Sequence, residues 1–319
     1  MLTSIVDWFL YVLLDLNSEI KWVQSLNFFI YDSVKIIILL FLMISIVGFL
    51  RTYIPPYKVK NWLSKRKHGV GNLLASIFGM ITPFCSCSSI PMFLGFLEAG
   101  VPLGITFSFL ITSPLVNEYL VVLMLGFFGW KITLLYILSG LLIGTFSGLI
   151  LGKMNLERFL EQDIHNKKSN MKEQVFNKIR ERLIFGLKES KSILKKLWLW
   201  ILVGVGIGAL IHNYIPRTVV EMIISKGGIW TVPIAVILGV PMYGSCAAIV
   251  PIAVALFRKG IPLGTALAFM MATSALSFPE AVILRSAMKL KLIGIFFLIV
   301  TIAIIITGYL FNLLQLTIL

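Results

Sequence analysis

Six long apolar stretches constrain this chain more than any other feature of its sequence. A helix needs about 20 apolar residues to cross about 30 Å of hydrocarbon, and most of these stretches approach or exceed that length. Hydrophobic residues make up 58% of the chain and charged residues only 13%, a balance outside the range of soluble domains. We therefore predict an all-α integral membrane protein. The stretches are Val34–Leu50, Pro102–Leu125, Ile132–Leu151, Leu197–Ile211, Pro262–Leu284 and Leu292–Leu314.

Basic residues are concentrated in two loops. Of the 28 Lys and Arg residues, twelve lie from Lys153 to Lys196 and six from Arg51 to Lys67. Such loops usually face the cytoplasm, so we expect a multi-pass protein of the cell (plasma) membrane with its central basic loop in the cytoplasm. Orientation and attraction to anionic lipid account for the net charge of +14, and no nucleic-acid partner is expected.

The second half of the chain repeats the first. The string GVPLG at Gly100–Gly104 returns as GIPLG at Gly260–Gly264, and polar and proline positions around both strings match in order. Recurring glycine and proline punctuation indicates a duplicated unit. We divide the chain into an N-terminal segment (1–33), a first membrane repeat (34–152), a basic cytoplasmic linker (153–196) and a second membrane repeat (197–319). Residues 1–17 either lie in the membrane interface or form a short span.

Proline interrupts one apolar stretch in each repeat. Val70–Leu97 is broken at Thr82-Pro83 and Trp230–Phe257 near Pro241, and irregular backbone in a membrane must be sheltered by protein or water. Counting crossings between the two basic loops leaves no net crossing for Val70–Leu97. We therefore predict a re-entrant helical hairpin there, the alternative being one long tilted span. Three transmembrane helices plus a broken hairpin give an odd number of crossings, so the two repeats are inverted, as in many secondary transporters.

The three cysteines lie inside apolar segments among small polar residues. The repeat aligns Ser86 with Cys246, so an inverted fold brings Cys85, Cys87 and Cys246 toward one axis. Soft thiolate ligands suit thiophilic species such as trivalent arsenic or copper(I). The alternative is that each cysteine is a small buried hydrophobe. The substrate-binding residues predicted in these strings are Cys85, Ser86, Cys87, Ser88, Ser245 and Cys246.

A second polar group follows in each repeat. Thr112-Ser113 in the first repeat pairs with Thr273-Ser274 in the second. Hydroxyls beside a helix irregularity can coordinate a cation or bind an anion, as in broken transporter helices. We predict that these side chains line the substrate site. The residues are Thr112, Ser113, Asn117, Thr273, Ser274 and Ser277.

Glu118 and Glu280 are the acids well inside the predicted spans. An ionised carboxyl group is costly in that environment, which suits a group that takes up and releases a proton. We predict a proton-coupling role for both residues. The alternative is that each lies at the end of a span and reaches the lipid headgroups or a loop lysine.

Signatures of enzymes are absent from the sequence. His68, His165 and His212 are isolated, and there is no H-E-x-x-H, G-x-S-x-G or P-loop pattern. We therefore expect no catalytic residue, no metal site and no cofactor. Two alternatives to a transporter stay open: a membrane thiol oxidoreductase or metal-handling protein that uses the cysteines, and a passive channel.

The strings PFCSCSSIP at Pro83–Pro91, AGVPLG at Ala99–Gly104 and TSPLVN at Thr112–Asn117 resemble the predicted-permease family that includes bacterial organoarsenical efflux permeases. The resemblance runs from about Val34 to the C-terminus. It implies a plasma-membrane permease and, in some members, extrusion of trivalent organoarsenicals.

Together these features predict a secondary transporter that exports a small thiophilic solute, such as a trivalent organoarsenical, or a small anion by alternating access. The expected partners are membrane lipid and a small-molecule or ion substrate, with a homo-oligomer as an option.

Overall fold

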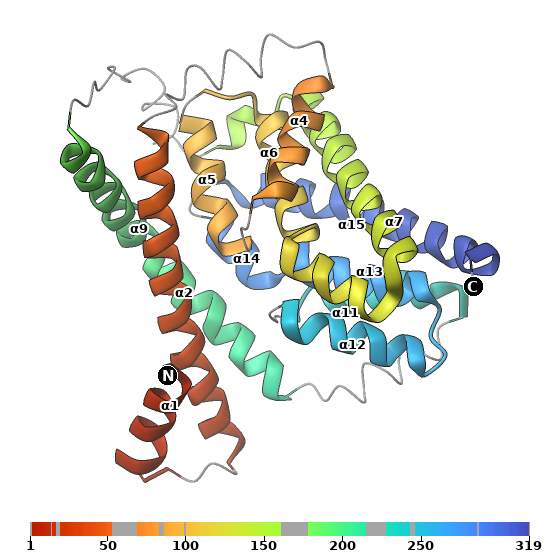
Figure 1. The fold of residues 1–319 in the computed structure, drawn as a ribbon, viewed down its shortest axis with the longest axis horizontal. Helices are drawn as coiled ribbons and strands as arrows, with labels where there is room; N and C mark the ends of the chain where they lie inside the picture. Colours follow the sequence, from red (N-terminus) through yellow and green to blue (C-terminus); the bar gives the residue numbers. More distant parts are fainter. Residues whose placement is uncertain are drawn as a thin grey trace.

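The computed structural model describes residues 2–13, 15–16, 20–52, 69–82, 86–98, 100–160, 178–214, 228–242, 246–285 and 287–318. Within this part all regular structure is helical, apart from one isolated β-bridge between Leu160 and Met288. Figure 1 shows a pair of long helices at one side and a compact group of mostly shorter helices at the other. The expected all-α fold is confirmed.

Four helical stretches in the described part are long and apolar enough to cross a membrane. They agree with the multi-pass membrane protein that composition predicts, since each reaches about the 20 residues that a span needs. The stretches are Trp22–Ile46, Glu118–Lys153, Leu263–Leu284 and Leu290–Gln315. Length and composition alone select them, and two are not single straight helices, because Glu118–Lys153 bends at Gly129 and Leu263–Leu284 is interrupted at Leu276.

The long helices α2 (Lys21–Arg51) and α9 (Ile179–Tyr214) pack against each other and form the pair at the left of Figure 1. At one close point, a Cβ on Gly186 would lie 2.5 Å from the Ser45 carbonyl oxygen, so only glycine allows this approach of the two backbones. The pair also packs against the compact group, through α9 with α14 and α2 with α5.

The N-terminal helices are short. The α-helix α1 (Leu2–Asp7) and the π-helix η1 (Trp8–Leu13) have six residues each, well under the about 20 residues of a spanning helix. Both are attached to the start of α2, because Asn27 Nδ2 donates to Asp7 Oδ1 at 2.7 Å and to the Tyr11 hydroxyl at 3.0 Å.

The first half of the compact group contains four helices: α4 (Val70–Ile81), α5 (Ser86–Glu98), α6 (Leu103–Leu115) and α7 (Glu118–Lys153). α4 packs on α6 and α7, and α5 packs on α6. α7 bends at Gly129, whose φ of 78° lies in the left-handed region that favours glycine. The helical segments 118–128 and 130–153 therefore point in different directions.

The second half repeats this arrangement with five helices: α11 (Thr231–Gly239), α12 (Cys246–Arg258), α13 (Leu263–Ala275), α14 (Phe278–Leu284) and α15 (Leu290–Ile318). α11 packs on α13 and α15, and α12 packs on α13. α14 and α15 take the places of the two segments of α7.

Close glycine contacts recur at matched positions of the two halves, in the register that aligns Gly104 with Gly264. A Cβ on Gly104 would lie 2.6 Å from the Gly148 carbonyl oxygen, and one on Gly264 would meet the Gly308 carbonyl oxygen. The same backbone-to-backbone approach therefore joins α6 to α7 and α13 to α15. A second matching pair of contacts is Gly79 with the Phe109 carbonyl at 2.9 Å and Gly239 with the Phe269 carbonyl at 3.0 Å.

The helix interruptions near Thr82 and Pro241 are present, because α4 ends at Ile81 and α11 ends at Gly239. Thr82 itself is extended, with φ −82° and ψ 128°. Residues 83–85 and 243–245 lie outside the described part.

Two predicted spans, Pro102–Leu125 and Pro262–Leu284, are not continuous helices. Val116 ends α6 with φ −130° and ψ 93°, and Leu276 ends α13 with φ −130° and ψ 25°. New helices begin after Asn117 and Ser277, residue types that favour the N-cap position. Each half therefore has two interrupted helical segments, where the sequence predicted one.

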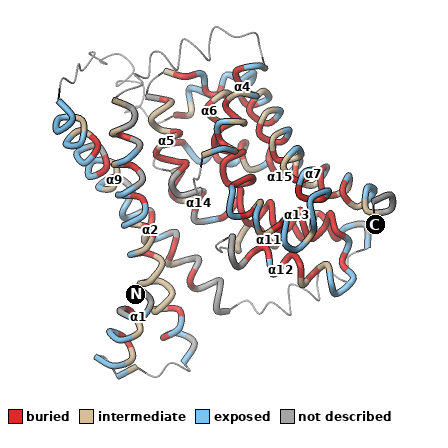
Figure 2. The backbone as a smooth tube through the Cα atoms, in the orientation of Figure 1, coloured by how far each residue is buried: buried red, intermediate tan, exposed pale blue. Residues whose placement is uncertain are grey.

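The helices α6 and α13 form the centre of the molecule. All residues of α13 are buried, and all of α6 except Ile105. Figure 2 shows this buried centre flanked by α7 and α15, whose outer faces are exposed. α6 and α13 are each 13 residues long, too short to cross hydrocarbon unaided, and their surroundings are protein.

A short contact joins the end of α7 to the start of α15. After α7, the 3-10 helix η2 (Leu156–Phe159) brings the Phe159 carbonyl to the backbone N–H of Lys289, which donates to it at 2.9 Å. Leu160 forms the isolated bridge with Met288. The cationic groups of Arg158 and Lys291 lie 4.9 Å and 5.3 Å from the centre of the Phe159 ring.

Candidate functional site

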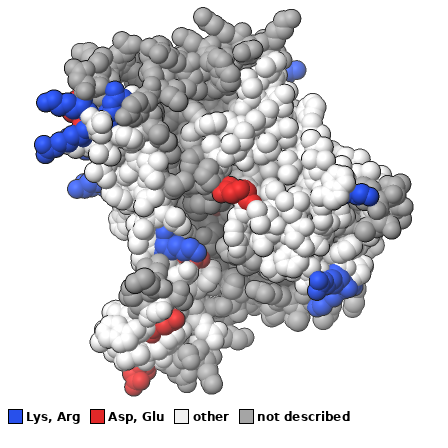
Figure 3. Space-filling model, viewed as in Figure 1, with Lys and Arg blue, Asp and Glu red and all other residues white. Residues whose placement is uncertain are grey.

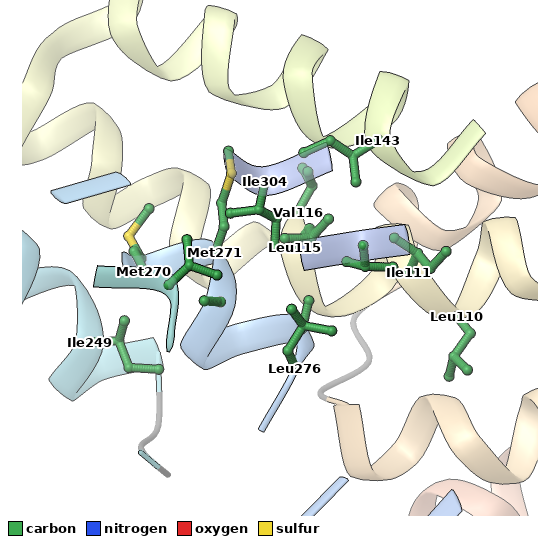
Figure 4. Close-up of a cluster of buried hydrophobic side chains, with 14 of the residues drawn as sticks. Leu110, Ile111, Leu115, Val116, Ile143, Ile249, Met270, Met271, Leu276 and Ile304 are labelled. Atoms are coloured by element: carbon green, nitrogen blue, oxygen red, sulfur yellow. The ribbon is translucent and has the colours of Figure 1, made fainter. Parts of the chain in front are cut away.

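The breaks after α6 and α13 meet in one apolar cluster at the centre of the molecule. Figure 4 shows Leu115, Val116 and Leu276 directed into the same space as side chains of α13 and α15. A helix break frees backbone donors and acceptors, which need partners in a buried, water-poor environment. These two breaks are therefore where we expect polar groups in the buried centre.

Protein groups close the first break. The Tyr136 hydroxyl donates to the Leu115 carbonyl oxygen at 2.9 Å. Asn117 caps the helix that follows, because its Oδ1 accepts the backbone N–H of Leu120 at 2.8 Å. Hydrogen bonds within the protein thus satisfy backbone groups on both sides of the break.

The other polar side chains of α6 are also bonded. Ser113 Oγ lies 2.7 Å from Ser89 Oγ on α5, and Thr112 Oγ1 donates to the Ser108 carbonyl at 2.9 Å. Asn72 Nδ2 on α4 donates to Ser108 Oγ at 2.9 Å and to the Gly104 carbonyl at 3.0 Å. The first half thus forms a polar network that holds α4, α5 and α6 together.

The second break is built differently. Phe296 stands at the position of Tyr136, so no hydroxyl reaches the end of α13 from there, and Ser277 makes no side-chain capping bond. Ser274 is 7% exposed and Glu280 2% exposed. Ser274 Oγ and both carboxylate oxygens of Glu280 are buried without a hydrogen-bond partner among the described residues. This break therefore retains polar groups that no described residue satisfies.

The predicted site residues fall into three groups. Thr112, Ser113 and Asn117 are buried and bonded around the first break. Thr273, Ser274 and Ser277 are buried around the second, where Thr273 Oγ1 donates to the Phe269 carbonyl at 2.9 Å. The side chains outside the described part are Cys85, Ser86, Cys87, Ser88, Ser245 and Cys246.

The two predicted proton-coupling residues lie in different environments. Glu118 is exposed at the first residue of α7, and Glu280 is buried in the first turn of α14. They are not equivalent positions, because the register that aligns Gly104 with Gly264 places Leu120 opposite Glu280 and Glu118 opposite Phe278. The same register pairs Ser113 with Thr273, one position away from the pairing expected from sequence.

Sequence reasoning missed Tyr136, Ser89 and Asn72, which complete the first polar network. In the same register each stands opposite an apolar residue, namely Phe296, Ile249 and Val232. This substitution of polar by apolar residues between matched positions is the signal that could have revealed them.

Charged side chains are few on the visible face of the molecule. Figure 3 shows most of its Lys and Arg side chains near the edges, an acidic group near the centre and otherwise mainly uncharged residues. The described residues contain no group of three or more His, Cys, Asp or Glu side chains that could hold a metal ion. The site is thus an apolar interior with a few hydroxyls and one buried carboxyl group.

Broken helices at the centre of a multi-pass helical bundle, with polar groups at the breaks, are typical of membrane transport proteins. Residues 21–313 match the model of a family described as "Predicted permease". The chain belongs to this family, and the resemblance found in its sequence strings is confirmed.

Two relatives are similar over most of this region. A protein of Streptococcus mutans serotype c, named "Putative two-component membrane permease complex subunit", is 25% identical over 199 residues, which cover 61% of this chain and 65% of that protein. The UPF0718 protein of Methanocaldococcus jannaschii is 21% identical over 284 residues, covering 69% of this chain and 76% of the relative. No solved structure matches the chain.

Proposed function

We propose that this protein is a secondary transporter that moves a small solute past the breaks after α6 and α13 by alternating access. The observation that carries the proposal is the pair of matched breaks in the buried centre, where one break keeps unsatisfied polar groups. A purely structural protein would gain stability by satisfying them, since unpaired buried polar groups cost about 1–3 kcal/mol each. A binding site keeps them available.

We further propose that the two halves are inverted repeats, with α4–α5 and α11–α12 as re-entrant hairpins. The support is that α4, α5, α11 and α12 have 9 to 13 residues, too few to span hydrocarbon. In addition, helix ends and glycine contacts match in the register of Gly104 and Gly264. Inverted halves that rock about a central site are a common basis of alternating access.

The proposed solute is a thiophilic species, such as a trivalent organoarsenical, that is exported from the cell. Cys85, Cys87 and Cys246 would bind it, because trivalent arsenic prefers thiolate ligands. The buried hydroxyls of α6 and α13 would line the path, and a proton gradient acting through Glu118 or Glu280 would supply the energy. The proposed location is the plasma membrane, with the basic segment 153–196 in the cytoplasm.

A protein partner is also proposed. The streptococcal relative is named as a subunit of a two-component membrane permease complex. The exposed apolar faces of α2 and α9 include Ile38, Leu42 and Leu199, and such surfaces contact either lipid or another membrane helix. Co-purification from membranes after mild solubilisation would identify a second subunit or a second copy of this chain.

Uptake of a trivalent organoarsenical, such as phenylarsine oxide, into everted membrane vesicles tests the function. We expect saturable uptake that depends on the protein and is lost when Cys85, Cys87 and Cys246 are all replaced by serine. A pentavalent organoarsenical, which lacks affinity for thiols, is the matched control. Uptake by the triple variant equal to that of the wild type would refute the thiol site, and flux that rises linearly with concentration would indicate a channel.

A further inference from the structure

Two polar side chains flank the break between α13 and α14 without satisfying each other or their neighbours. Ser274 lies in the last turn of α13, and Glu280 lies in the first turn of α14. Both are more than nine-tenths buried, and neither the hydroxyl nor the carboxylate has a hydrogen-bond partner among the described residues. A buried carboxylate is stable only if it is protonated or balanced by a positive charge.

The first half shows that the fold does not require these groups. In the register of Gly104 and Gly264, Pro114 stands at the position of Ser274 and Leu120 at the position of Glu280. Leu120 is fully buried, so the same place accepts an apolar side chain. The first half therefore forms the same break without a hydroxyl or a carboxyl group at these two positions.

Local helix capping does not explain Glu280 either. Ser277 and Glu280 have the spacing of a capping box, in which the glutamate returns to the backbone N–H of the N-cap residue. Here both oxygens of Glu280 lack a partner among the described residues, and the Ser277 side chain makes no capping bond. By contrast, Asn117 caps its helix in the first half. Capping of α14 therefore does not account for the buried carboxyl group of Glu280.

No described side chain of the elements around α14 hydrogen-bonds to Glu280. α14 packs against α9 and α5, and the Phe278 N–H donates to the Val240 carbonyl after α11. Neither α11 nor α13 contains a charged residue. None of the described charged side chains of α9 bonds to Glu280. The described charged side chains of these two helices all lie on α9 and are Arg180, Glu181, Arg182, Lys188, Lys191 and Lys195. The titratable side chains outside the described part are Glu189, Lys196, His212 and Tyr214 on α9 and Cys87 and Glu98 on α5.

We propose that Glu280 and Ser274 bind one monovalent cation, a proton or a sodium ion, and that this is the coupling-ion site of the permease. This role in coupling rests on the proposed function. One carboxylate balances one positive charge, and no group of three acidic, His or Cys ligands is present in the described part to hold a multivalent metal ion. The Ser274 hydroxyl and the carbonyls freed at the end of α13 are oxygen ligands, which a hard cation prefers.

Ion binding can be measured on the full chain in detergent without any solute. We expect the Tm of the wild type to rise when pH is lowered in choline chloride, or when NaCl replaces choline chloride at constant pH. The reason is that a ligand bound only by the folded protein stabilises it. A response to pH alone identifies a proton, and a response to NaCl identifies sodium.

Two variants of one residue and a control make the test decisive. Glu280→Gln and Glu280→Leu should both lose the rise in Tm, and Glu280→Leu should fold, because Leu120 occupies the matched position. Glu157→Gln, at an exposed acid of η2, should respond as the wild type does. The proposal is wrong if the wild type responds to neither ion, if Glu280→Leu still responds, or if Glu118→Gln alone abolishes the response. Failure of arsenical uptake with the ion response intact would overturn only the proposed solute.

Discussion

The breaks after α6 and α13 stand at matched positions and differ in their hydrogen bonding. Both follow a buried 13-residue helix and end it at a residue with φ −130°. In the first, Tyr136 and Asn117 satisfy the backbone, whereas in the second Ser274 and Glu280 are buried without a partner among the described residues. The comparison teaches that matched positions of two similar halves can carry different side chains, one set bonded and the other without a partner among the described residues.

The differences between the halves extend beyond the breaks. Hydrogen-bonded Asn72, Ser89 and Tyr136 of the first half correspond to apolar residues in the second. A bonded polar network holds its helices in one arrangement, because each broken bond leaves an unsatisfied group. The second half has inter-helix polar contacts at other positions, since Thr265 Oγ1 donates to Thr231 Oγ1 and Asn312 Nδ2 donates to Thr265 Oγ1, both at 3.4 Å. The two halves therefore place their polar contacts at different positions of a similar helix arrangement.

The largest expected effect comes from the close glycine contacts that join α6 to α7 and α13 to α15. Substitution of these glycines tests whether both halves have the same close backbone approach. Gly264→Ala places a methyl group against the Gly308 carbonyl and Asn312, and overpacking of this kind costs up to about 3 kcal/mol. Gly104→Ala should be similarly destabilising, because its Cβ would lie 2.6 Å from the Gly148 carbonyl. Thermal unfolding in detergent measures both.

Gly294→Ala is the matched control in the same helix as Gly308. A Cβ at Gly294 would meet nothing within 4 Å, so this variant should unfold at or slightly above the wild-type temperature. If Gly264→Ala is as stable as Gly294→Ala, the close approach of α13 and α15 is not a feature of the folded protein.

The next effect concerns the closure of the first break. Tyr136→Phe removes the donor to the Leu115 carbonyl and should destabilise the protein by about 2 kcal/mol, because a buried acceptor loses its partner. It also converts the first half to the residue that the second half carries, Phe296. Tyr119→Phe, at an exposed tyrosine, should change stability by less than about 0.5 kcal/mol. Equal effects of the two variants would contradict the closed first break.

The smallest effect compares the two N-caps directly. Asn117→Ala should cost about 1 kcal/mol, the usual value for loss of an N-cap hydrogen bond. Ser277→Ala should cost much less, because the Ser277 side chain makes no capping bond. The difference between the unfolding temperatures of the two variants measures how much more the Asn117 cap stabilises its helix than Ser277 does. A larger drop in unfolding temperature for Ser277→Ala would contradict this comparison.

Much of the fold follows from the sequence. Apolar stretches and the repeat of GVPLG as GIPLG predict a helical membrane protein with duplicated parts, because both signals depend on composition and on local backbone chemistry. Proline likewise marked the interruption near Thr82. The interruption at Val116 was not separated from the span Pro102–Leu125, because Pro114 lies inside α6 and the N-cap signal of Asn117 was assigned to substrate binding.

The candidate site was predicted less completely. Glu118 and Glu280 look alike in sequence, since each follows a helix that ends in apolar residues, yet one is exposed and the other buried. Only the packing of α14 against α9 and α5 separates them, and no local pattern encodes such contacts. Partners for Tyr136 and Ser113 likewise come from other helices.

The contact between Phe159 and Lys289 has a mechanical consequence. It ties the last turn of one half to the first turn of the long helix of the other, with a backbone hydrogen bond of 2.9 Å. The two halves also pack against each other where α7 meets α12 and α15 and where α6 meets α13, so this hydrogen bond is one directional link within a broad apolar contact. Apolar side chains tolerate small sliding movements, whereas a backbone hydrogen bond fixes which residues stand opposite each other. The junction therefore sets the alignment of the two long helices at one end of the molecule.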